Sequence, residues 1–166
     1  MVCERELSSD FNPKKILDQI KSSYQKAPHF KDVFLLLESI FYDNETNLFK
    51  YILNSVTAVN NYTGIRTEIV ISSTINIDHP LKSEDKVLAL CKALDAGIYY
   101  NSIGGMELYS KERFHRMGID LKFIKTDAIH YKQFKNDFVP WLSIIDVLMF
   151  NTKEEVGVML NKYTLL

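Results

Sequence analysis

The stretch Ile98-Tyr99-Tyr100-Asn101-Ser102-Ile103-Gly104-Gly105 decides the fold class. Its first five residues are typical of a short strand, and the two glycines predict a sharp turn into a helix. Residues 119–125 alternate between apolar and polar side chains and predict the next strand. A helix over about residues 106–117, stopped by Gly118, connects the two strands. Strand, helix, strand is the pattern of a βαβ unit with parallel strands.

Upstream of this unit the same pattern is expected once more. Glu68-Ile69-Val70-Ile71-Ser72 is short and rich in β-branched residues, which predicts a strand. Ser83 is the expected cap of a helix that Asp95-Ala96-Gly97 closes. The whole is therefore a βαβαβ parallel sheet, a class that needs cover on both faces.

The first third of the chain is predicted to be helical. Asp10 is the expected N-cap of a helix with Pro13 in its first turn, and Gly64 is the expected stop of the third helix. The apolar stripes of these helices favour a core, with a partner-binding face as the alternative. C-terminal helices follow, one opened by Pro140 and one by the capping box Thr152-Lys153-Glu154-Glu155. We expect one α/β domain over residues 1–166, with a helical part (10–64) and an α/β part (65–166) resembling part of a Rossmann-like fold.

Composition narrows the classes of partner. The 166 residues carry 20 basic and 21 acidic side chains, a net charge of −1, with no basic run for nucleic acid. No apolar stretch approaches the roughly 20 residues of a membrane helix. The start, Met1 to Asp10, is polar and unlike a signal peptide. Two distant cysteines and four scattered histidines show no metal-ligand spacing. We therefore expect a cytoplasmic protein with no membrane, nucleic-acid or metal partner.

The first candidate site is the bend Asn101 to Gly105. In open α/β sheets ligands bind beyond the carboxyl ends of the strands, and a helix N-terminus favours an anion. Asn101, Ser102, Gly104 and Gly105 are accordingly candidate ligand-binding residues. The alternative is that Gly104 and Gly105 only permit a tight turn.

The second candidate is the stretch Tyr131 to Trp141, which interleaves aromatic side chains with an amide and a proline. Such a composition suits a planar or sugar ring, and Tyr131 and Gln133 are the candidate ligand-binding residues. The alternative is a loop pinned onto the core by its own aromatic rings.

Ser143 and Asp146 are three residues apart and share one side of the following helix. Asp146 has apolar neighbours, so its carboxylate needs a hydrogen-bond partner or a function. Pinning a neighbouring loop is the simpler role, and Asp146 is also the candidate catalytic group. His115 and His130 could serve as acid–base groups or lie on the surface as ordinary polar residues.

Several segments resemble the WbqC-like family. They are Tyr24-Gln25-Lys26-Ala27-Pro28-His29-Phe30, Tyr100-Asn101-Ser102-Ile103-Gly104-Gly105, Tyr131-Lys132-Gln133-Phe134 and, most specifically, Phe138-Val139-Pro140-Trp141-Leu142-Ser143-Ile144-Ile145-Asp146-Val147-Leu148-Met149-Phe150-Asn151. The resemblance runs from about Leu7 to the C-terminus. It implies a role in bacterial surface-polysaccharide (O-antigen) synthesis, with transfer of an amino acid such as glycine to an amino sugar as one suggested reaction. It names no cofactor.

One departure from the family pattern bears on activity. Members of the family usually begin with a further strand, a Gln-Pro-aromatic-Pro loop and a helix, and we expect this segment to be missing before Asp10. Its absence would leave a sheet edge and apolar surface uncovered, so we expect homo-oligomerisation or poor solubility.

Three functions remain open from the sequence. The first is a transferase acting on a nucleotide-linked amino sugar, with Asp146 as base or orienting group. The second is a non-catalytic binding or assembly module, which the lack of a legible nucleophile–base pair favours. The third is an inactive truncated member. In the first, the ligand-binding residues are Asn101, Ser102, Gly104, Gly105, Tyr131, Gln133 and Ser143.

Overall fold

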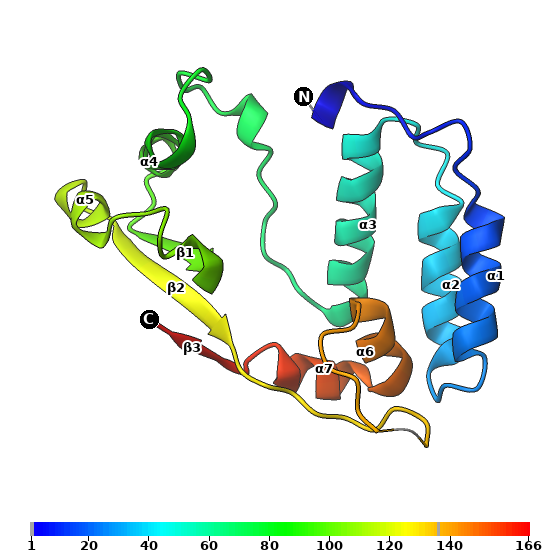
Figure 1. The fold of residues 1–166 in the computed structure, drawn as a ribbon. Coiled ribbons are helices and arrows are strands. Elements are labelled where there is room, and N and C mark those ends of the chain that lie inside the picture. The colour runs from blue at the N-terminus through cyan, green and yellow to red at the C-terminus, as the bar shows by residue number, and fades with distance from the viewer. Residues whose placement is uncertain (1, 136) are drawn as a thin grey trace. The chain divides into compact units, whose positions relative to one another are not determined.

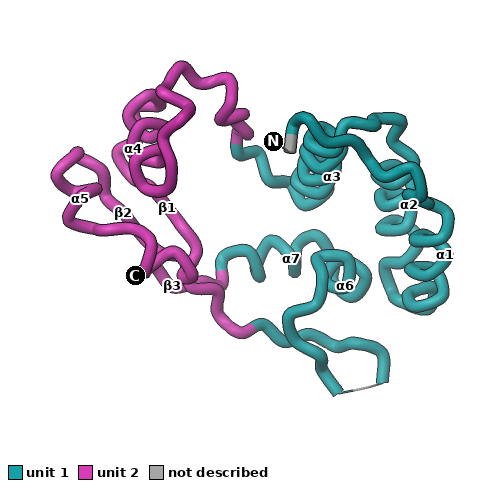
Figure 2. The backbone as a smooth tube through the Cα atoms, turned by 45° about the horizontal axis from the view of Figure 1, so that its top comes forward, with its two compact units in different colours: residues 1–67, 129–161 teal, residues 68–128, 162–166 magenta. Residues whose placement is uncertain are grey.

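The computed structural model describes residues 2–135 and 137–166. Within these ranges the chain divides into two compact units (Figure 2). Unit 1 comprises residues 1–67 and 129–161, and unit 2 comprises residues 68–128 and 162–166. The expected α/β class is confirmed, with helices in both units and a three-stranded sheet in unit 2. The helical part therefore includes the segment 129–161 in addition to the expected N-terminal helices.

Unit 1 begins with the short 3-10 turn η1 (Val2–Glu4), followed by helices α1 (Pro13–Tyr24), α2 (Phe30–Phe41) and α3 (Leu48–Thr63). The N-cap of α1 is Asn12, whose side chain accepts from the Lys15 backbone N–H at 3.0 Å, so the expected cap Asp10 is wrong. The reason is that Pro13 occupies the first helical position, which fixes the cap directly before it. Gly64, at φ 78°, ends α3 as predicted.

Helices α6 (Ile144–Phe150) and α7 (Lys153–Met159) complete unit 1 (Figure 1). The predicted capping box of α7 is confirmed, with Thr152 and Glu155 as its two partners. The prediction that Pro140 opens a helix is wrong, because Trp141 has φ 61°, which is outside the helical region. Ser143 caps α6 instead, three residues further on.

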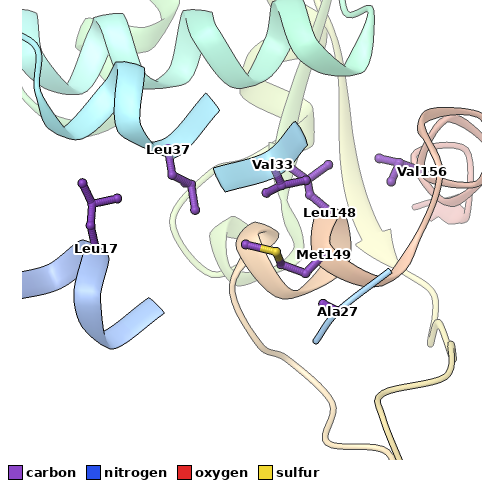
Figure 3. Packing of buried hydrophobic residues seen from close by; sticks show 7 residues of the cluster. All are labelled: Leu17, Ala27, Val33, Leu37, Leu148, Met149 and Val156. Atoms are coloured by element: carbon purple, nitrogen blue, oxygen red, sulfur yellow. The ribbon is translucent and has the colours of Figure 1, made fainter. Parts of the chain in front are cut away.

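The core of unit 1 is built from apolar side chains of its helices and their connections. Figure 3 shows seven of them: Leu17, Ala27, Val33, Leu37, Leu148, Met149 and Val156. Each fully buried aliphatic side chain of this kind contributes about 1.5–3 kcal/mol. The His29 backbone N–H also donates to the Met149 carbonyl at 3.1 Å, so the chain before α2 is bonded to α6. This packing fixes where α6 presents its first turn.

Unit 2 contains η2 (Ser72–Thr74), α4 (Ser83–Ala93), β1 (Ile98–Ser102), η3 (Ile103–Gly105), α5 (Lys111–Arg116), β2 (Asp120–Thr126) and β3 (Tyr163–Leu165). The sheet order is β1-β2-β3, with β1 and β2 parallel and β3 antiparallel to β2. One βαβ unit of the expected parallel sheet therefore forms. The third strand is the unpredicted C-terminal segment rather than residues 68–72.

Three sequence expectations in unit 2 need correction. Residues 68–71 form no strand, and Ile69 and Val70 remain exposed, because β-branched composition needs a neighbouring strand to pair with. Ser83 is the first residue of α4 rather than its cap. The helix expected over 106–117 is confined to Lys111–Arg116, since Ser110 caps it by accepting from the Arg113 backbone N–H at 3.3 Å. Gly118, at φ 76°, follows it as predicted.

Candidate functional site

A buried carboxylate marks the strongest candidate site, which lies wholly in unit 1. Asp146 is in the first turn of α6, and only 3% of its surface is exposed. Ser143 begins this helix, its hydroxyl accepting from the Ile145 backbone N–H at 3.3 Å. The next turn places Leu148 and Met149 in the core, which fixes the rotation of the helix and turns Asp146 inward.

Three neutral side chains donate hydrogen bonds to the Asp146 carboxylate. The Tyr131 hydroxyl donates to Oδ1 at 2.6 Å, and the Gln133 amide donates to the same oxygen at 2.7 Å. The Tyr24 hydroxyl donates to Oδ2 at 3.0 Å from α1. We call these four residues the Asp146 network. A buried carboxylate needs such partners, because desolvation without them costs several kcal/mol.

Burial and the carboxylate keep both phenols protonated. Burial, followed by the hydrogen bond to Asp146, raises the pKa of Tyr24 to about 12. The same two causes, in the same order, raise the pKa of Tyr131 further. At neutral pH both hydroxyls are therefore donors, and Asp146 is the acceptor at the centre of the network.

Gln133 clamps the loop onto itself with both ends of its amide. Its Oε1 accepts from the Val139 backbone N–H at 2.7 Å, and its Nε2 donates to the Val139 carbonyl at 3.1 Å. Gln133 is buried, and its hydrogen bond to Asp146 also joins this loop to α6. Within the loop, Phe134 adopts φ 40°, and Asn136 lies outside the described residues.

Aromatic rings fix the loop as well. Phe134 packs edge-on against Phe150 of α6, with ring centroids 4.7 Å apart. Phe138 contacts both Tyr131, at 5.1 Å, and His130, at 4.7 Å. These contacts agree with the alternative expectation for this stretch, a loop held by its own aromatic rings. The His130 side chain is exposed and lies against Phe138.

Trp141 is the exception to this packing. It is 80% exposed and holds φ 61°, a left-handed conformation that costs a residue with a side chain about 1–2 kcal/mol. It lies between two fixed points, Val139 in the Gln133 clamp and Ser143 at the start of α6. Backbone strain that surrounding structure maintains is a common feature of ligand-binding segments.

The candidate bend of the βαβ unit lies in unit 2. There the Asn101 side chain accepts from the Ser102 backbone N–H at 2.8 Å. Gly105 is buried, and a Cβ on it would overlap the Asn101 side chain and lie 3.3 Å from the Tyr109 ring. Gly104 faces open space. Close packing is therefore the local reason for Gly105.

The start of α5 is already occupied by a carboxylate of the chain. Glu84 accepts from the Ser110 backbone N–H at 2.7 Å and from the Arg113 guanidinium at 2.7 Å. The helix therefore begins after Ser110, several residues beyond Gly105. An anion was expected at the bend because a helix N-terminus was expected there, and this reason does not apply to the helix observed. His115 of α5 lines an open depression together with Lys111 and Arg116.

The candidate residues fall into two separate sets. Tyr131, Gln133 and Asp146 share one hydrogen-bond network in unit 1, and Ser143 begins the helix that carries Asp146. The other candidates, Asn101, Ser102, Gly104 and Gly105, belong to unit 2. Among the described residues no cluster of three or more His, Cys, Asp or Glu side chains is placed to hold a metal ion.

The profile of the WbqC-like protein family matches residues 1–158, nearly the whole chain. The chain belongs to the WbqC-like protein family. No curated protein and no solved structure matches it. As for its relation to membranes, the described part of this WbqC-like protein contains no helix with the length and apolar character of a membrane span.

Tyr24 is the network residue that sequence reasoning did not select. No site role was expected for it, although it belongs to the apolar stripe of the first helix and to the segment Tyr24 to Phe30 that resembles the family. A phenol on such a stripe needs a partner for its hydroxyl when buried, and this requirement was the available signal. Its partner, Asp146, is 122 positions away along the chain, so the pairing itself emerges only from the fold of this WbqC-like protein.

Proposed function

We propose that this WbqC-like protein is a transferase that modifies a nucleotide-linked amino sugar in bacterial surface-polysaccharide synthesis, and that unit 1 holds the sugar. The family resemblance supplies the pathway and the suggested reaction class. The Asp146 network and the loop from Tyr131 to Trp141 are the reason to place the sugar in unit 1. On this proposal the ligand is a small molecule of the cytoplasm.

The observation that carries the proposal is the position of Trp141. An indole that is 80% exposed between two fixed backbone points offers a flat apolar surface with a single N–H donor. The C–H face of a pyranose ring is also flat and apolar, and its hydroxyl groups accept and donate around the rim. Ligand sites typically combine such aromatic surface with a few polar groups held in place.

In this proposal Asp146 and Gln133 are positioning residues. Both Asp146 oxygens accept hydrogen bonds from the network, and the side chain is buried, so it holds the loop rather than touching the ligand. Gln133 transmits that hold to Val139, two residues before Trp141. The network thereby limits the motion of the aromatic surface before a sugar arrives.

A thermal-shift screen of nucleotides and nucleotide-linked sugars tests the proposal. A ligand at about 100 times its Kd adds about 2.7 kcal/mol to the stability of the protein. We expect stabilisation by an amino-sugar nucleotide, and loss of that stabilisation in Trp141→Ala. The matched control is Tyr42→Ala, which removes another exposed aromatic side chain of unit 1. Melting curves that no sugar nucleotide moves, or an equal loss in the control, would refute it.

A non-catalytic assembly module is the second candidate. It is favoured by α3, on which Ile52 and Val56 lie one turn apart and are both about half exposed. If this reading holds, Ile52→Asp abolishes a complex in cells, while Gln133→Ala leaves the surface glycan unchanged. The transferase proposal expects the reverse: altered glycan in Gln133→Ala and normal glycan in Ile52→Asp.

A further inference from the structure

Helices α4 and α5 of unit 2 border an open cavity of about 550 Å³. Its lining comes from residues 81–92, in and just before α4, and from residues 113–117, in and just after α5. The cavity therefore lies wholly within unit 2. Sites for small molecules have volumes of about 300–1,000 Å³, so this one is large enough for a small organic molecule.

Half of the lining residues are apolar. They are Leu81, Leu88, Ala89 and Met117. Leu88 is buried and belongs to the core of unit 2, whereas Met117 is 50% exposed. A flexible thioether beside an aliphatic surface can adapt to apolar groups of different shape. This part of the lining favours a ligand with an apolar body.

A cluster of ion pairs ties the two helices together at the cavity. The Arg113 guanidinium of α5 donates to Glu84 of α4 at 2.7 Å and also pairs with Asp85 of α4. Glu84 accepts in addition from the Ser110 backbone N–H at 2.7 Å. Asp85 is the one acidic residue among the described residues of the lining, and Arg113 compensates its charge.

Two further cations line the cavity. Lys92 and Arg116 are exposed, and within residues 2–135 and 137–166 neither forms an ion pair. Each lies in the last turn of its helix, where a cation also compensates the helix dipole. That role leaves the hydrogen-bond donors of both side chains free. An ammonium and a guanidinium are the groups that bind carboxylates and phosphates.

We propose that the cavity between α4 and α5 binds an organic anion with an apolar body. The carboxylate or phosphate of this ligand accepts hydrogen bonds from Lys92 and Arg116, and its apolar body lies against Leu88 and Met117. The charge of the ligand follows from the lining. With Asp85 paired to Arg113, the two remaining charges are both positive. This inference is independent of the proposed transferase function, whose residues lie in unit 1.

NMR titration of the amide resonances with four small probes tests the proposal. Octanoate and octyl phosphate carry an anionic head and an apolar body, whereas octanol lacks the charge and inorganic phosphate lacks the body. We expect at least one of the two amphipathic anions to shift the resonances of Ala89, Lys92 and Met117 until they saturate. Octanol and inorganic phosphate should bind about 10 times more weakly or less. The tighter of the two anions identifies the head group.

Variants of the lining locate the bound anion. Lys92→Gln and Arg116→Gln each remove one positive charge at an exposed position, so the fold should be kept. Each is expected to raise the Kd about 10-fold, which corresponds to about 1.4 kcal/mol. Lys111→Gln is the matched control, because Lys111 of α5 lines the neighbouring depression and not this cavity. Met117→Ala removes apolar contact and is expected to weaken binding several-fold.

Four results would overturn the proposal. If Lys92 and Arg116 serve the helix dipoles alone, neither amphipathic anion gives a saturable shift. Octanol that binds as tightly as octanoate would show that the cations take no part. A Kd in Arg116→Gln or Met117→Ala equal to that of the wild type would remove the assigned contacts. An equal loss of affinity in Lys111→Gln would place the anion elsewhere on α5.

Discussion

At the scale of single residues, the Asp146 network explains an ionisable group in an apolar setting. Asp146 follows two isoleucines and precedes a buried Leu148–Met149 pair, so its position in α6 obliges the side chain to enter the interior. Three donors from two other segments meet it there. Removing any one of them leaves a buried acceptor with less compensation, and each removal therefore has a measurable cost.

Gln133→Ala should destabilise the protein by about 1–3 kcal/mol, since it removes the bond to Asp146 and both bonds to Val139. Urea unfolding followed by circular dichroism measures the change. Gln19→Ala in α1 is the control, because that side chain is exposed. Equal stability of the two variants would contradict the clamp.

The raised phenol pKa values predict a loss of stability in alkali. Burial and Asp146 hold the pKa of folded Tyr24 at about 12, whereas the unfolded phenol has its ordinary value near 10. The unfolded state thus loses its proton first, and the contribution of Tyr24 to stability is complete below about pH 10 and lost as the pH approaches about 12.

Urea midpoints measured across this alkaline range check the sign. Tyr24→Phe should flatten the decline, because phenylalanine has no proton to lose. Tyr42→Phe, at an exposed phenol, should leave the slope of the wild type. A Tyr24→Phe protein that loses stability as steeply as the wild type would contradict the assignment.

Trp141→Gly should separate stability from binding. Glycine adopts φ 61° without the steric penalty, so the unfolding free energy should rise by up to about 1 kcal/mol, while the indole surface is lost. Chemical denaturation and ligand titration of the same sample measure both effects. A variant that is less stable than the wild type would show that Trp141 packs on the protein instead of facing solvent.

At the scale of elements, the bend after β1 offers a matched pair of glycines. A Cβ on Gly105 would lie 3.0 Å from Asn101 Cγ and 3.3 Å from the Tyr109 ring, whereas a Cβ on Gly104 meets nothing within 4 Å. Gly105→Ala should therefore cost about 1–3 kcal/mol, and Gly104→Ala should be nearly neutral. Thermal unfolding of the two variants makes the comparison, and equal melting temperatures would contradict the packing.

Local signals in the sequence predicted most helices and the βαβ unit. Gly64, Gly118 and the Thr152 capping box act within one turn of the chain, so their effect is legible from neighbouring residues. The strand expected at residues 68–72 and the unpredicted β3 show the opposite case. A strand depends on a partner far along the chain, and β3 pairs with β2 about 40 positions earlier.

The candidate site likewise contains residues that the local sequence indicates and residues that only the fold brings to it. Asp146 was selected because a carboxylate among apolar residues needs a partner, and Gln133 because an amide interleaved with aromatic side chains suits a planar or sugar ring. The pinning of the loop was the simpler of the roles expected for Asp146, and the hydrogen bonds to Tyr131 and Gln133 agree with it. The contribution of Tyr24 and the exposed, left-handed Trp141 depend on how α1 and α6 pack.

At the scale of the whole molecule, the residues that we propose for sugar binding belong to unit 1 alone. Unit 1 carries the Asp146 network and Trp141, whereas unit 2 carries the bend Asn101 to Gly105. A variant in unit 2 that leaves the fold intact should therefore leave sugar binding unchanged. Gly104→Ala, at an open position of unit 2, is expected to bind sugar nucleotide as the wild type does.

The central claim is that a sugar is held against Trp141 by a loop that the Asp146 network fixes. Trp141 is the single tryptophan of the chain, so its fluorescence reports on this surface alone. Titration with nucleotide-linked amino sugars should give a saturable change in emission, with a clearly weaker Kd in Gln133→Ala. Emission that stays constant across every such ligand, or an identical Kd in Gln133→Ala, would contradict the account.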